Sequence, residues 1–134
     1  MKTFDVQSIE INAPAQAVHR YIAEPRNLPA WTHAFSVADD SGAAMRTPNG
    51  EVQIQLQTQS DEATGVVDWT MRFHDGSEGR AFSRVAPLDV ERCVYSFVLL
   101  APPVPLEMLE GALDAQMQIL ARELVSLKRI VEAR

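Results

Sequence analysis

One cysteine and the lack of any long apolar run set the first limits on this chain of 134 residues. Cys93 has no second cysteine with which to form an internal disulfide, and an isolated cysteine does not hold a metal. No stretch approaches the roughly 18 consecutive apolar residues that a membrane helix requires, and the N-terminus has no signal-peptide core. We therefore expect a cytoplasmic protein without membrane insertion.

Basic residues are also scarce, since 12 lysines and arginines stand against 18 aspartates and glutamates, a net charge of −6. Nucleic-acid binders need clustered positive charge to displace counterions from phosphates, so this balance argues against nucleic acid as a partner. Apolar residues make up 46% of the chain, enough for one hydrophobic core. Length and composition together predict one domain, residues 1–134.

Motifs for metal binding, phosphate binding and nucleophilic catalysis are missing. The three histidines lack metal-ligand spacing, and no Cys-x-x-Cys or His-Glu-x-x-His motif is present. No Gly-x-Ser-x-Gly elbow occurs, and Gly76 and Gly79 lie in a predicted hairpin tip, not a phosphate loop. We expect no metal site and no cofactor, with His19 at the periphery of a helix and His74 at the hairpin tip.

The sequence does contain a clear order of β and α patterns. Phe4–Ile11 alternates polar and apolar residues, which predicts a strand. Pro14 then begins a helix that ends before Pro25, and a second short helix follows with Leu28 and Trp31 facing inward. Between residues 35 and 102, turn signals separate six alternating segments, and Pro-Asn-Gly at 48–50 predicts a tight hairpin.

The last part of the chain predicts one long helix. After prolines at 102, 103 and 105, apolar residues recur every three or four positions from Leu106 to Val131, over about 28 residues. Acidic residues lie in its first turns and basic residues near its end, as the helix dipole favours. We therefore expect an α+β protein: a curved antiparallel sheet of about seven strands wrapped around a long C-terminal helix, with two short helices after the first strand.

This arrangement resembles the helix-grip fold of the START-like, or birch-pollen-allergen (SRPBCC), superfamily, and most of all its polyketide cyclase/dehydrase and lipid-transport branch. The resemblance spans nearly the whole chain and is carried by Ile9-Glu10-Ile11-Asn12-Ala13-Pro14 leading into Val18, by Glu24-Pro25-Arg26-Asn27-Leu28-Pro29-Ala30-Trp31, and by the terminal amphipathic helix. These are strand-to-helix and packing signals, so they specify the fold better than the activity. The resemblance implies a ligand cavity between the sheet and the long helix.

Strand parity then sorts the side chains that would line such a cavity. The lining set predicted from parity, from the mouth segment and from the first half of the long helix is Trp31, Phe35, Val52, Ile54, Leu56, Val67, Trp69, Met71, Ser83, Met108, Leu109 and Ala112. Small residues beside tryptophans and methionines suit a flat apolar ligand, because aromatic faces and thioethers adapt to one. The alternative is that the same side chains simply fill the core.

Two residues are candidates for proton transfer, namely His33, near the expected mouth, and Tyr95 on the last strand. The last strand is apolar on both parities, so the direction of Tyr95 stays open. Tyr95 and Phe97 facing outward would instead suggest a homodimer surface.

Three functions fit these patterns. The first is a small-molecule binding protein for an apolar or aromatic ligand, lipid- or polyketide-like. The second is an enzyme of the polyketide cyclase, aromatase or dehydratase kind that uses the same pocket, and the third is a protein-interaction module with a filled cavity. Parity directs no cluster of polar residues into the cavity, and a carrier needs few polar groups, so the sequence favours binding.

Overall fold

A computed structural model describes residues 3–47, 50–101 and 106–134, without the side chains of residues 47 and 106–112. Seven strands form one sheet in the order β1-β7-β6-β5-β4-β3-β2, and every neighbouring pair is antiparallel. The strands are β1 (Phe4–Ile11), β2 (Phe35–Ala38), β3 (Ala43–Thr47), β4 (Gly50–Asp61), β5 (Val66–Arg72), β6 (Glu78–Pro87) and β7 (Cys93–Leu100). The helices are α1 (Ala15–Ala23), the short 3-10 turn η1 (Pro25–Asn27), α2 (Leu28–Trp31) and α3 (Leu106–Glu132).

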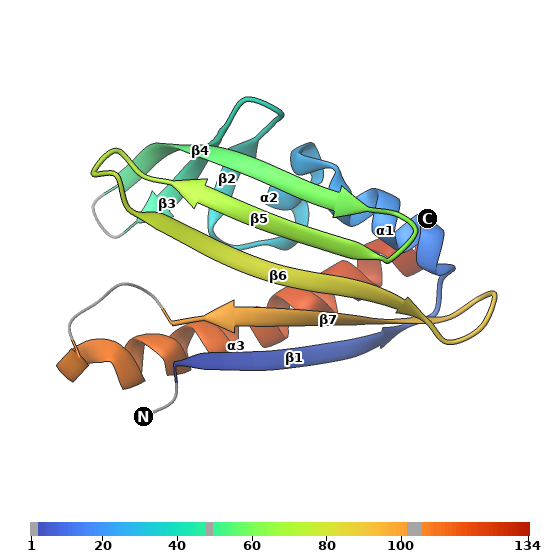
Figure 1. Ribbon diagram of the computed structural model, residues 1–134. Coiled ribbons are helices and arrows are strands. Elements are labelled where there is room, and N and C mark those ends of the chain that lie inside the picture. The colour runs from blue at the N-terminus through green and yellow to red at the C-terminus, as the bar shows by residue number, and fades with distance from the viewer. Residues whose placement is uncertain (1–2, 48–49, 102–105) are drawn as a thin grey trace.

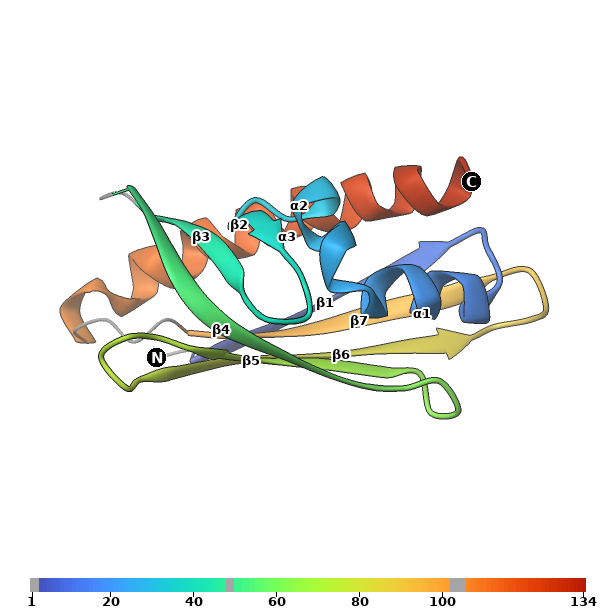
Figure 2. The same cartoon turned by 90° about the horizontal axis from the view of Figure 1, so that it is seen from above.

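The sheet curves around the helices, as the sequence predicts. Figure 1 shows α3 running along the sheet near β1 and β7, and Figure 2 shows α1, α2 and α3 on the same side of the sheet. The predicted turn at 48–50 lies outside the described residues except for Gly50, and so does the proline segment at 102–105. The α+β helix-grip architecture is confirmed. Within the described part of the chain, no helix is long and apolar enough to span a membrane.

The apolar stripe of α3 faces the concave side of the sheet. Its buried members recur at three-, four- and seven-residue steps, which keeps them on one face of the helix. They are Leu113, Leu120, Leu124, Leu127 and Val131. Full burial of each leucine side chain contributes about 1.5–3 kcal/mol, so this stripe is a main attachment of α3 to the rest of the core.

The direction of β7, open from the sequence, is inward for its odd-numbered residues. Cys93 and Tyr95 are fully buried, and Phe97 packs against the same core cluster. Burial raises the pKa of the Cys93 thiol, so this cysteine behaves as a small apolar side chain. Tyr95 and Phe97 therefore do not form an outward-facing dimer surface.

His19 lies in the interior rather than at the periphery of α1, which corrects the sequence expectation. The imidazole is buried, and its Nε2 lies 3.1 Å from the carbonyl oxygen of Val66 on β5. The curved sheet covers a wider face of α1 than the apolar positions Val18 and Ile22 define, so the neighbouring position is also enclosed. The hydrogen bond satisfies the imidazole there.

The turn between β4 and β5 lies in close contact with the backbone of β6. Gly65 has a φ of +80°, and a Cβ at this position would lie 2.0 Å from the carbonyl oxygen of Val85. The amide N–H of Val85 donates to the carbonyl of Gly65 at 2.8 Å, and the Gly65 N–H donates to Asp61 O at 2.9 Å. Only glycine allows both the left-handed conformation and this contact.

Candidate ligand-binding site

Four aromatic rings meet in the interior, between the sheet and the helices. Trp31 of α2 lies 6.5 Å from Trp69 of β5 and 6.3 Å from Tyr95 of β7, measured between ring centroids. Phe97 stacks on Trp69 at 6.0 Å and meets Tyr95 edge to face at 6.4 Å. We call these four residues the aromatic cluster; their offset and edge-on geometries are the ones that aromatic pairs favour.

The cluster owes its room to small residues on β6, the strand between β5 and β7. Ala81 pairs with Trp69, and Ser83 pairs with Phe97. Because both side chains are small and face the interior, the large rings on the flanking strands lean across β6 toward one another. The alternation of large and small residues on adjacent strands therefore builds the cluster.

Three polar atoms of the aromatic cluster are buried without a hydrogen-bonding partner among the described residues: Trp31 Nε1, Trp69 Nε1 and Tyr95 Oη. The exposed fractions of these residues are 4%, 5% and 0%. An indole N–H can only donate, so an acceptor is needed to satisfy it. An unsatisfied buried polar group typically costs about 1–3 kcal/mol, which makes three in one cluster a notable feature.

Tyr95 is a neutral donor at physiological pH. Burial raises the pKa of Tyr95 far above its usual range, and the carboxylates of Glu123 and Asp68 add to the rise, while the nearby Ser83 hydroxyl offsets part of it. The Ser83 hydroxyl donates its own proton to Val67 O at 2.5 Å, and the Tyr95 hydroxyl is left without a partner in hydrogen-bonding geometry within the described residues.

Glu123 of α3 places a partly buried carboxyl group near the segment after α2 and close enough to Tyr95 to act on it electrostatically. Its Oε2 accepts the backbone N–H of His33 at 2.5 Å. Burial raises the pKa of Glu123 above its usual value, and the His33 hydrogen bond offsets part of that rise. A carboxyl of this kind exchanges its proton closer to neutral pH than an exposed one does.

The segment after α2 is held closed by hydrogen bonds. Thr32 Oγ1 donates to Leu28 O at 2.7 Å, which caps the end of α2. Arg46 of β3 donates from Nη1 to His33 O at 3.0 Å, while the N–H of His33 bonds to Glu123. These contacts attach the segment that follows Trp31 to α2, to β3 and to α3.

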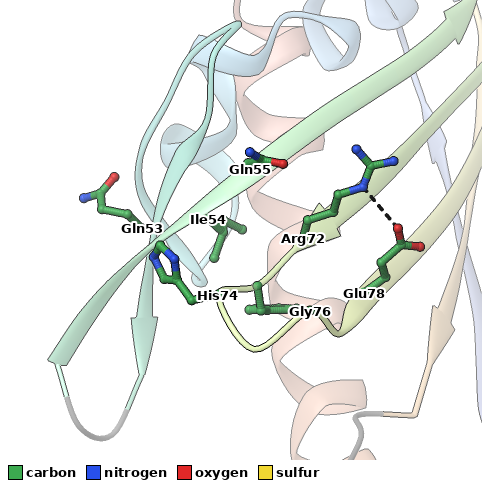
Figure 3. Close-up of a pocket in the computed structure, with 8 residues that line it drawn as sticks. Gln53, Ile54, Gln55, Arg72, His74, Gly76 and Glu78 are labelled. Atoms are coloured by element: carbon green, nitrogen blue, oxygen red, sulfur yellow. Dashed lines mark hydrogen bonds and ion pairs between the residues drawn. The ribbon is translucent and has the colours of Figure 1, made fainter.

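A pocket of about 360 Å³ opens where β4 and β5 separate (Figure 3). The last paired residues of these strands are Gln55 and Arg72. Arg72 Nε donates to Glu78 Oε1 at 3.1 Å across the β5–β6 hairpin. The lining residues are Gln53, Ile54, Gln55, Arg72, Phe73, His74, Gly76 and Glu78. We call this pocket the β4–β5 slot.

Comparison with known proteins identifies the architecture. No protein-family model and no curated protein matches the chain. A START superfamily protein from Mycobacterium smegmatis superposes with a TM-score of 0.68 at 12% identity, over 98% of this chain and 99% of that one. The chain has the START-like fold.

Two further solved structures with this fold are described as aromatase/cyclases. Zhui from Streptomyces sp. R1128 matches with a TM-score of 0.67 at 12% identity, over 98% of this chain and 94% of that one. BexL, a di-domain ARO/CYC from the BE-7585A biosynthetic pathway, matches with a TM-score of 0.73 at 18% identity, over 98% of this chain. The chain spans 47% of BexL, about half of its length. Identities this low relate the folds and not the activities.

The START-like fold brings most of the predicted lining residues into the core. Those that are buried or pack partly buried against the core cluster are Trp31, Phe35, Ile54, Leu56, Val67, Trp69, Met71 and Ser83. Val52 is instead 37% exposed, because this end of β4 pairs with β3 alone and extends past β5. The side chains of Met108, Leu109 and Ala112 lie outside the described residues.

The two candidates for proton transfer have different positions. Tyr95 lies in the aromatic cluster, whereas the residue His33 is exposed and contacts Glu123 through its backbone. His74 is exposed, as predicted, and lines the β4–β5 slot. Among the residues described, no three histidines, cysteines or carboxylates gather as a metal site.

Glu123 is the residue that sequence reasoning missed in this START-like fold. A usable signal exists, because position 123 is three residues after Leu120 and four before Leu127, both in the apolar stripe. An ionisable residue inside a buried stripe carries a desolvation cost, which usually marks a specific role or partner.

Proposed function

We propose that this protein binds a small, largely apolar ligand, aromatic or lipid- or polyketide-like, between the curved sheet and α3. The observation that carries the proposal is the set of buried donors on Trp31, Trp69 and Tyr95 that have no partner among the described residues. A ligand that places oxygen acceptors within the aromatic cluster would satisfy donors that are costly to leave unpaired. The aromatic faces around them favour a flat ligand body.

The charge distribution favours an uncharged ligand. The buried polar or charged residues among those described are Asp5, His19 and Ser83, and none of them is a lysine or arginine. An anionic ligand in the cluster would also approach Glu123, whose carboxyl already tends to keep its proton because of burial. A ketone, quinone or ether oxygen on an apolar skeleton fits better than a carboxylate.

An enzyme of the cyclase, aromatase or dehydratase kind is the second candidate function. The observation that favours it is Glu123, because burial raises the pKa of this carboxyl and its charge acts on Tyr95. In such a reaction Tyr95 would donate a hydrogen bond to a carbonyl oxygen, and Glu123 would transfer the proton. This role predicts that Glu123→Gln abolishes turnover of a poly-carbonyl substrate while keeping its binding.

Native mass spectrometry of freshly purified protein tests the binding function, since a co-purifying compound would identify the ligand class. A matched set of probes then tests the acceptor argument: 2-acetylnaphthalene, 2-naphthoate and 2-ethylnaphthalene share a ring system and differ in one group. We expect 2-acetylnaphthalene to bind about tenfold more tightly than the other two, by calorimetry and by tryptophan fluorescence. No co-purifying compound and no binding of any probe would favour an interaction module with a filled core.

A further inference from the structure

The β4–β5 slot arises because β4 continues beyond its last pair with β5, which ends at Arg72. Beyond the Gln55–Arg72 pair, β4 continues to Gly50 and pairs only with β3. The tip of the β5–β6 hairpin bonds to itself instead, with Phe73 N–H donating to Ser77 O at 3.0 Å and Gly76 N–H donating to Phe73 O at 3.0 Å. Since the backbone bonds at the tip stay within the hairpin, the gap next to β4 is left open.

The floor of the slot belongs to the hydrophobic core. Ile54 is a buried member of the core cluster, and Phe73 packs against that cluster partly buried. In Figure 3 the Ile54 side chain lies between β4 and the hairpin that carries His74 and Gly76. The slot is therefore separated from the interior by apolar side chains and not by a layer of backbone.

A row of side chains leads from the slot to the aromatic cluster. Phe73 follows β5 directly and has the same parity as Met71 and Trp69, so the three side chains occupy one face in succession. Met71 packs partly buried on the core, and Trp69 carries one of the unpartnered indole N–H groups. A ligand that passes Phe73 and Met71 thus arrives at the proposed binding donors.

Gly79 leaves these two side chains room to move. It pairs with Met71 across the sheet, and a Cβ there would lie 3.3 Å from Met71 Cε and 3.6 Å from Phe73 Cε2. A side chain at position 79 would fill the space next to both groups. The thioether of Met71 has flexible torsions and adapts to new neighbours at little cost.

The segment after α2, which the sequence places at the mouth, is closed within the described part of the chain. Trp31 and Phe35, which the sequence places at the mouth, are both buried. The segment between them is fixed by the bonds of His33 to Glu123 and to Arg46. The slot, in contrast, has a rim of neutral amides and a guanidinium that is already paired with Glu78, which suits passage of an uncharged molecule.

We propose that the β4–β5 slot is the route by which ligand reaches the interior, with Phe73 and Met71 as the side chains that open and close it. The inference rests on the proposed binding function. A gate changes association and dissociation rates by the same factor and leaves the equilibrium constant unchanged, because it affects only the barrier.

Stopped-flow tryptophan fluorescence with 2-acetylnaphthalene tests the route. We expect Phe73→Ala to raise both rate constants about three- to tenfold and Gly79→Val to lower both, with Kd within about twofold of the parent value. Phe82→Ala is the matched control, because Phe82 faces away from buried Ser83 on β6, and it should change neither rate. A change in Kd carried by one rate alone would make Phe73 part of the binding site and overturn the gate.

A cross-link provides a second measurement that does not depend on altering the core. Cysteines introduced as Gln53→Cys on β4 and His74→Cys after β5, both of which line the slot, can be joined by a bis-maleimide reagent. We expect the cross-linked double variant to bind and release the probe at least tenfold more slowly than either single variant treated with the same reagent. Unchanged rates with intact binding would overturn the route alone, whereas failure of the parent protein to bind the probe would overturn the binding function and the route together.

Discussion

The backbone N–H of His33 donates to Glu123 Oε2 at 2.5 Å, which joins the segment after α2 to the middle of α3. The same carboxyl group acts electrostatically on Tyr95 in the aromatic cluster. One side chain of α3 thus connects the segment after α2 with the proposed binding donors, and its protonation state affects both.

Glu123→Gln is expected to change how stability depends on pH. Burial raises the pKa of Glu123 above 4.5 in the folded protein, so the folded state keeps this proton to higher pH than the unfolded state does. Stability is therefore lost as pH rises from about 4.5 through the raised pKa. Glutamine keeps an acceptor for His33 and carries no charge, so the variant should gain stability relative to the parent between about pH 4 and pH 7.5, as measured by urea unfolding.

Glu132→Gln is the control, for which the expected change in stability near neutral pH has the opposite sign. Hydrogen bonds from Lys128 and from the Asn12 N–H lower the pKa of Glu132, and its contribution is present above the unfolded pKa and lost as pH falls through the folded pKa. This variant should lose stability relative to the parent at about pH 7.5 and match it in acid. Parallel trends in the two variants would contradict the assignment for Glu123.

Tyr95→Phe is expected to weaken ligand binding without lowering the stability of the fold. The Tyr95 hydroxyl is buried without a partner among the described residues, so its removal should leave the free energy of unfolding unchanged or raise it by about 1 kcal/mol. Affinity for 2-acetylnaphthalene should fall about three- to tenfold, because an acceptor on the ligand loses its donor. Tyr21→Phe is the matched control, since Tyr21 makes none of the ring contacts of the aromatic cluster and its ring packs against Arg134, and it should keep full affinity. A large loss of stability in Tyr95→Phe would show that the hydroxyl is satisfied without ligand.

Gly65→Ala is expected to destabilise the fold by more than about 2 kcal/mol, through backbone strain and through the contact with Val85 O. Gly76→Ala provides the comparison, because Gly76 has a φ of +88° but no atom within 4 Å of its Cβ position. It should carry only the conformational cost of about 1 kcal/mol. Equal losses in the two variants, measured by urea unfolding, would mean that the backbone relaxes away from Val85.

Cys93 should react very slowly with an aromatic disulfide reagent in the folded protein. Its side chain is fully buried, and burial raises the pKa of the thiol, so both access and thiolate formation are suppressed. We expect the rate to rise at least about 100-fold on unfolding in urea. Cys93→Ser combined with Val90→Cys provides a fast reference, because position 90 is 87% exposed. A fast reaction of native Cys93 would reveal local opening of β7.

The sequence predicts the strand and helix order well because each strand's alternation and each turn signal is a local property. The apolar stripe of α3 and the inward direction of Trp69 also follow from local sequence patterns and are predicted correctly. Parity is uninformative on β7, where residues of both faces are apolar, and the direction of Tyr95 follows only from pairing with Ile9 and Val85.

The functional details depend on distances between segments and therefore escape a sequence pattern. The contact of His33 with Glu123 joins residues 90 positions apart, and the burial of His19 depends on how far the sheet curves around α1. The β4–β5 slot exists because β4 continues past the end of β5. The predicted hairpin tip marks the end of β5, but no local signal shows which residue of β4 it reaches.

The pairing of β1 with β7 has a consequence for how the chain folds. Strands β2 to β6 each adjoin the next strand in sequence, so their hairpins form from nearby residues. Strand β1 instead pairs along its length with the final strand, from Phe4–Leu100 to Ile11–Cys93. Loop closure over that separation is slow, and synthesis at about 5–20 residues per second delays it further. During synthesis on the ribosome, β1 therefore remains unpaired for several seconds, and the β1–β7 edge of the sheet is completed only after β7 has emerged.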